Sequence, residues 1–113
     1  MNELIEQIRK FNEERDWAQF HSPKNLVMAL SVEVGELVEN FQWLTQDQSK
    51  NLKPEKFEKV RDEIADVIIF LLNLTDKLGI NPIEAAKEKL KINRKNYPVE
   101  RVKGKALKYT EYK

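Results

Sequence analysis

The sequence predicts an all-α protein whose protomer resembles a four-helix bundle. Only three glycines and four prolines occur in 113 residues, which favours a few long elements over many short strands. Apolar residues recur at the three- and four-residue spacing of amphipathic helices. The length suits one small domain over residues 1–113, and the absence of cysteine excludes disulfides and thiol chemistry.

The first half of the chain predicts two helices. Apolar residues at helical spacing place the first helix at about Asn2–Arg15; they are Leu4, Ile5, Ile8 and Phe11. Ser22 and Pro23 form a start signal, since serine caps a helix and proline suits its first position. The second helix is therefore expected from Pro23 to about Trp43.

Two further helices follow a polar loop at residues 45–53. Pro54 starts the third helix, which reaches Leu78, and the next residue is a glycine suited to a C-cap. Asn81 and Pro82 repeat the capping pattern and start the fourth helix, which ends near Asn96. The tail, residues 99–113, has no clear period and is expected to be irregular.

The third predicted helix is apolar around much of its circumference. Its apolar residues are Ile64, Val67, Ile68, Phe70, Leu71, Leu72 and Leu74. A helix with this pattern must be buried on several sides, which four short helices cannot easily provide. We therefore predict a homo-oligomer, a homodimer or homotetramer, with the functional site near a subunit interface.

The charge balance excludes several classes of partner. Twenty basic and 19 acidic residues create no strong field for a nucleic acid polymer or a membrane surface. The longest apolar run is too short to span a bilayer, and the N-terminus does not resemble a signal peptide. A cytoplasmic protein is expected.

Four carboxylates interrupt the two most apolar stretches of the chain. Glu33 and Glu36 lie in the second helix, and Glu63 and Asp66 lie in the third. Residues three apart share one side of a helix, so antiparallel packing would bring four oxygen ligands together. Such ligands suit Mg²⁺ or Mn²⁺, and without a cation their repulsion would raise at least one pKa. The alternative is that each pair is an ordinary solvated helix face.

These residues resemble a known family. The E-x-x-E and E-x-x-D pairs resemble those of the MazG-like all-α nucleotide pyrophosphohydrolases. The segments that resemble the dCTP pyrophosphatase branch are Phe11–Leu26, Phe41–Trp43, Asn93–Pro98, Gly104 and Lys108–Glu111.

The resemblance implies an enzyme that hydrolyses a nucleoside triphosphate to the monophosphate and pyrophosphate with Mg²⁺. Glu33, Glu36, Glu63 and Asp66 would be the metal ligands and catalytic residues. The implied substrate is dCTP or a modified dCTP, and the implied role is house-cleaning of the nucleotide pool. A cation in this reaction acts as a Lewis acid and helps to generate the nucleophile.

Aromatic and polar residues near the acidic pairs are candidates for substrate binding. Trp17 and Trp43 can stack on a nucleobase, although both could instead belong to the core. Gln19 and His21 can hydrogen-bond a base edge or a phosphate, although a histidine beside a helix start is often a surface or cap residue. Phe70 is also a candidate, and it stands where dCTP-specific members of the family carry tyrosine.

Basic and polar residues near the C-terminus are candidates for phosphate binding. Lys89 and Asn93 lie four residues apart and share one helix face. The resemblance makes both of them candidates, and Lys103, Lys108 and Tyr109 weaker ones. The alternative is a solvated helix face.

Two other functions remain open at the level of sequence. One is the same reaction with a broad or different base preference. The other is a non-catalytic helical interaction protein, in which the acidic pairs would meet lysine or arginine residues of a partner.

Overall fold

The computed structural model describes residues 1–106, which contain helices and no strand. The elements are α1 (Asn2–Glu14), the 3₁₀ turn η1 (Ala18–Phe20), α2 (Pro23–Glu39), α3 (Gln46–Lys50), α4 (Pro54–Leu78), α5 (Pro82–Asn96) and α6 (Val99–Val102). The prediction of an all-α protein is confirmed.

The long helices begin where the capping residues predict. The Ser22 hydroxyl accepts a hydrogen bond from the Asn25 backbone nitrogen at 3.2 Å, and Pro23 occupies the first turn of α2. The Asn81 side chain accepts from two backbone nitrogens at the start of α5. Gly79 ends α4 with a left-handed φ of 68°, a conformation that costs glycine little.

Three local expectations were wrong in detail. The second helix ends at Glu39 rather than near Trp43, and turns follow it. The expected loop at residues 45–53 contains α3, which begins with a capping box between Thr45 and Gln48. In the tail, α6 adds one short helical segment at Val99–Val102.

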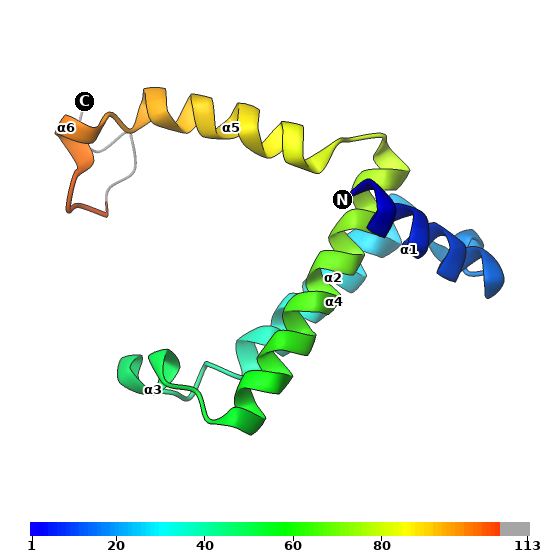
Figure 1. Cartoon of the computed structure of the whole chain (residues 1–113), viewed down its shortest axis with the longest axis horizontal. Helices are drawn as coiled ribbons and strands as arrows, with labels where there is room; N and C mark the ends of the chain where they lie inside the picture. Colours follow the sequence, from blue (N-terminus) through cyan, green and yellow to red (C-terminus); the bar gives the residue numbers. More distant parts are fainter. Residues whose placement is uncertain (107–113) are drawn as a thin grey trace. The chain divides into compact units, whose positions relative to one another are not determined.

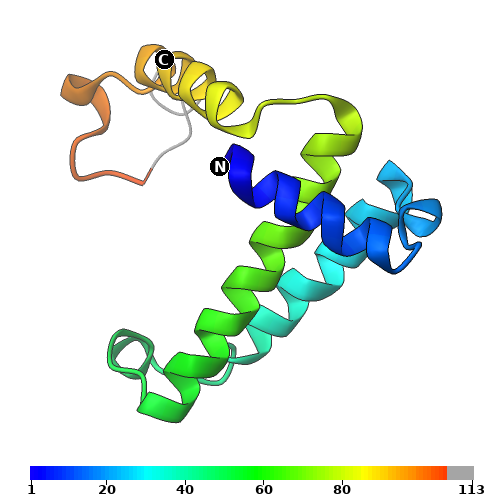
Figure 2. The same ribbon diagram turned by 45° about the vertical axis from the view of Figure 1, so that its right-hand side comes forward.

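The chain forms two compact units, residues 1–79 and residues 80–113. In the first unit, α2 and α4 lie antiparallel and side by side, and α1 crosses α4 near the C-terminal end of α4 (Figures 1 and 2). In the second unit, α5 is followed by α6. Three long helices thus pack together in the first unit, so a closed four-helix bundle stays a prediction.

Two polar contacts fix α1 against α4. Arg9 forms a bidentate pair with Asp76, in which Nε donates to Oδ2 at 2.8 Å and Nη2 donates to Oδ1. One turn away, the Asn12 amide donates to the Asn73 carbonyl oxygen at 2.8 Å, and both side chains are buried. Hydrogen bonds of this kind set the register of two helices more strictly than apolar contacts do.

The apolar core of the described chain is small. The buried apolar residues are Ile8, Leu26, Val60 and Leu72, of which Leu26 is fully buried. Apolar side chains on α2 and α4 stay exposed instead, including Met28 (58%) and Val32 (59%). Within residues 1–106, none of the helices combines the length and the apolar character that crossing a bilayer requires.

Candidate metal and nucleotide site

Three of the four predicted carboxylates converge where α2 and α4 lie side by side. Glu33, Glu36 and Glu63 each offer an oxygen, and these oxygens lie within 4.8 Å of one another. The antiparallel packing produces this arrangement, because residues three apart on α2 project toward the same face of α4. Glu33 and Glu63 are half-buried, whereas Glu36 is exposed.

The cluster has the electrostatics of an uncompensated acidic site. Partial burial, followed by the charge of Glu36, raises the pKa of both Glu33 and Glu63. The expected rise in pKa is therefore confirmed. One oxygen of Glu33 and one of Glu63 are fully buried and have no hydrogen-bond partner in the described chain. Buried acceptors without partners fit a cation, which would satisfy both of them.

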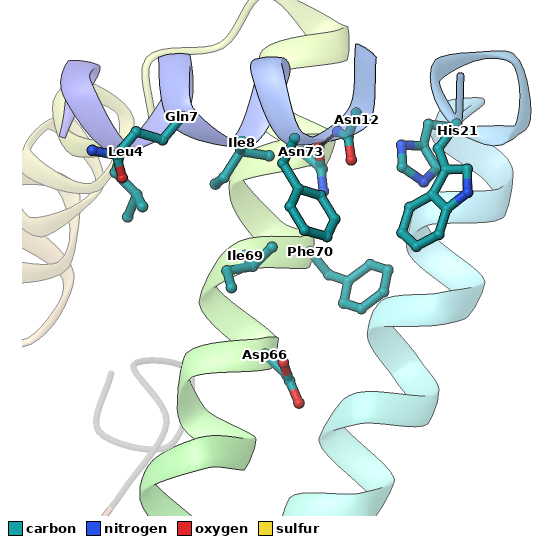
Figure 3. Close-up of a pocket in the computed structure, with 11 residues that line it drawn as sticks. Leu4, Gln7, Ile8, Asn12, His21, Asp66, Ile69, Phe70 and Asn73 are labelled. Carbon is teal, nitrogen blue, oxygen red and sulfur yellow. Dashed lines mark hydrogen bonds between the residues drawn. The ribbon is translucent and has the colours of Figure 1, made fainter. Parts of the chain in front are cut away.

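Asp66 lies outside this group of three. Its charge still contributes to the raised pKa of Glu33 and Glu63, so it is close to them. Its side chain lines a neighbouring cavity of about 370 Å³ between α1 and α4, and it is the residue that links the acidic cluster to this cavity (Figure 3).

The cavity has the size and lining of a small-molecule site. Its aromatic and polar lining residues are Phe11, Trp17, Phe70, Gln7, Asn12, His21, Asn73 and Asp66. Leu4, Ile8 and Ile69 complete the wall. Trp17 packs edge-on against Phe11, with ring centroids 5.6 Å apart, and stays 44% exposed. An aromatic wall with a few polar groups suits a flat heterocycle.

His21 faces the cavity from the segment before α2 (Figure 3). Burial, with a smaller contribution from the charge of Lys77, lowers the pKa of His21 and favours the neutral form of its ring. Its Nδ1 is buried and has no hydrogen-bond partner among residues 1–106. A neutral imidazole offers one donor and one acceptor to a ligand.

Two residues that were predicted to bind substrate, Gln19 and Trp43, do not line the cavity. The Gln19 amide donates to the Asp16 carbonyl oxygen and carboxylate at 2.9 and 3.0 Å, and thus stabilises the turn at Asp16. Trp43 is 86% exposed, which excludes the core of the described chain. Trp17 lines the cavity, whereas Trp43 does not. The two residues are separated along the chain by α2, whose 17 residues span about 25 Å.

The predicted phosphate-binding residues belong to the second unit. Lys89 is exposed and Asn93 is half-buried, and both lie on α5. Lys103 is exposed after α6, whereas Lys108 and Tyr109 lie outside the described residues. The roles of these residues stay predictions.

Two asparagines that line the cavity, Asn12 and Asn73, were not predicted from the sequence. Asn12 follows Ile8 and Phe11 on the apolar side of α1, and Asn73 interrupts the run from Leu71 to Leu74. A polar residue inside an apolar stripe was the available signal, and it is the same signal that identified the carboxylates.

Comparisons with known proteins identify the family of this chain. The profile of the MazG-like family matches residues 28–112. The chain belongs to the MazG-like family. This assignment confirms the resemblance seen in the acidic pairs, and the matched region contains both pairs.

Relatives of the MazG-like chain share most of its length. Proteins named dCTP pyrophosphatase 1 from Mus musculus and Homo sapiens are 40% and 39% identical to it, over 95% of this chain. The chain spans 66% of the length of each of these relatives. A crystal structure of a pyrophosphatase from Archaeoglobus fulgidus superposes with a TM-score of 0.83 at 44% identity, covering 87% of this chain and 92% of that one.

Proposed function

We propose that this protein is an Mg²⁺-dependent nucleoside triphosphate pyrophosphohydrolase that acts on dCTP or a modified dCTP. The products would be the nucleoside monophosphate and pyrophosphate. The observation that carries the proposal is the pair of buried, unpartnered oxygens on Glu33 and Glu63, beside a cavity with an aromatic wall. The relatives named dCTP pyrophosphatase support the choice of substrate.

The acidic residues would hold the divalent cation. Glu33, Glu36 and Glu63 supply hard oxygen ligands, and Asp66 is the candidate fourth ligand. A bound cation would neutralise phosphate charge and act as a Lewis acid toward the phosphates. Mn²⁺ fits the same donor set.

The cavity would hold the nucleobase, and the phosphates would lie toward Asp66. Phe70 is one helical turn from Asp66 on α4, so an aromatic ring and a metal-binding carboxylate share one face. Trp17 and His21 line the same cavity from the segment between α1 and α2 and are proposed to contact the base.

The protein is also proposed to be a homodimer or homotetramer. Exposed apolar residues on α2 and α4 include Val27, Met28, Val32, Val34, Val38, Phe57, Ile64, Ile68, Ile69 and Leu71. Because monomers rarely expose large apolar patches, this number of exposed apolar side chains on two adjacent helices supports an association surface. Because the carboxylates lie on the same two helices, this surface supports a site near a subunit interface.

The test is pyrophosphate release from a panel of ribo- and deoxyribonucleoside triphosphates, with Mg²⁺ and with EDTA. Metal-dependent release that is strongest with dCTP or a 5-substituted analogue is the expected result. Metal-dependent release without base preference would support the proposed reaction but contradict the proposed preference for dCTP. The absence of release from every nucleotide would favour a non-catalytic interaction protein.

A further inference from the structure

We propose that Asn12 and Asn73 determine base selectivity by hydrogen-bonding the edge of a nucleobase in the cavity. This inference rests on the proposed function, since it assumes that the cavity holds the base of a nucleotide. The preferred base would carry an exocyclic amino group beside a ring-nitrogen acceptor, as cytosine and adenine do.

The first support is the incomplete hydrogen bonding of the pair. Asn12 Nδ2 donates to Asn73 Oδ1, which uses one group of each amide. The other two side-chain atoms, Asn12 Oδ1 and Asn73 Nδ2, have no hydrogen-bond partner among residues 1–106. Neither is among the fully buried, unpartnered atoms, so both reach open space. One acceptor and one donor are thus left for a ligand.

The second support is position. Asn12 and Asn73 lie side by side at the end of the cavity remote from Asp66 (Figure 3). Asp66 and Asn73 are seven residues apart on α4, which is about 10 Å along the helix. A nucleoside placed with its phosphates at Asp66 would therefore present its base edge to the pair.

The third support is the match between donors and acceptors. The Asn12 oxygen would accept from the exocyclic amino group, and the Asn73 amide would donate to the adjacent ring nitrogen. Thymine and uracil present a carbonyl and an N–H at these positions, so both contacts would be reversed. A buried polar group left unpaired by the wrong ligand gives strong discrimination, whereas apolar walls discriminate weakly.

The decisive variant is Asn73→Asp, which keeps the acceptor for Asn12 and replaces the free donor with a second acceptor. We would measure kcat/KM for dCTP, dATP and dTTP, together with binding of the three deoxynucleoside monophosphates in EDTA by calorimetry. The control is Gln7→Glu, which adds the same charge to the cavity wall outside the pair.

Asn73→Asp is expected to lower the ratio of dCTP to dTTP, in kcat/KM and in monophosphate affinity, by at least about tenfold. Gln7→Glu should keep the wild-type ratio. An equal loss for all nucleotides, or an equal change in both variants, would overturn the inference and leave the pair as a contact between helices only. The binding measurement separates this inference from the proposed function. Selective binding of a monophosphate without hydrolysis of any triphosphate would reject the proposed enzymatic activity and support the contact between the asparagine pair and the base.

Discussion

At the scale of single residues, a substitution of Glu63 can distinguish a metal-binding role of this carboxylate from a purely structural role. Replacement with glutamine keeps the shape of the side chain and removes one charge from a cluster in which burial and Glu36 already raise the pKa of Glu63. We expect Glu63→Gln to reduce activity by about 100-fold or more, since even residues behind a ligand contribute 10- to 100-fold. Its thermal stability in EDTA should equal or exceed that of the wild type.

Thermal melts with and without Mg²⁺ would check this prediction. The wild type should gain stability from Mg²⁺ by mass action, about 2.7 kcal/mol at one hundred times the dissociation constant, whereas Glu63→Gln should lose that gain. Glu39→Gln, at the exposed end of α2, is the matched control and should behave as the wild type. A Glu63→Gln variant that stays active would contradict the assignment of a ligand.

At the scale of elements, the attachment of α1 to α4 should depend on pH. The hydrogen bonds and charge of Arg9 lower the pKa of Asp76 below that of a free aspartate. Such a group stabilises the folded state above its unfolded-state pKa of about 3.9, and this contribution is lost as pH falls through the folded pKa. The difference in melting temperature between the wild type and Asp76→Asn should therefore be constant near pH 7 and shrink below about pH 4.

Adding Arg9→Met to Asp76→Asn provides the control for this pH dependence. Once Asp76 no longer has its charge, loss of the arginine should cause no further pH-dependent destabilisation. A stability difference that does not vary with pH would show that the pair contributes nothing beyond packing.

A substitution of Gly35 tests whether another protein surface packs closely against α2 at this position. A glycine within a helix costs about 1 kcal/mol relative to alanine, and a methyl group at Gly35 would meet no atom within 4 Å apart from its chain neighbours and the backbone of its own helix. Gly35→Ala should therefore raise the free energy of unfolding of the protomer by about 0.5–1 kcal/mol, measured by urea denaturation. Destabilisation instead would show that another surface, such as a second subunit, packs closely against Gly35.

The helices could be predicted because their signals are local. Ser22 with Pro23 and Asn81 with Pro82 are caps that act within one turn, and they appear in the structure as expected. The segment α3 was missed although Thr45 and Gln48 form a readable capping box, because five residues are too few to show a hydrophobic period.

The candidate site was only partly predictable, because it depends on contacts between distant residues. The acidic pairs were visible as charges in apolar helices, and the packing of α2 against α4 brings three of the four carboxylates together. The contact between Asn12 and Asn73 joins residues 61 positions apart, so no local pattern reports it. The separation of Trp43 from the cavity likewise follows from the length of α2.

At the scale of the whole molecule, the exposed apolar surface predicts that stability and assembly are coupled. Met28 lies on α2 and is 58% exposed in the single chain. If the chain were a monomer, Met28→Lys would change stability by less than about 0.5 kcal/mol, as surface substitutions usually do. If a second copy covers this face, the lysine must lose its hydration or break the interface.

We expect Met28→Lys to reduce the molar mass measured by light scattering after size exclusion and to lower the melting temperature. The wild-type melting temperature should rise with protein concentration, because association stabilises the folded state by mass action. Glu14→Lys is the matched control, since this exposed position in the last turn of α1 favours a positive charge. A wild type that is monomeric at all concentrations would reject the homo-oligomer, and the apolar face of α2 and α4 would then need a different partner.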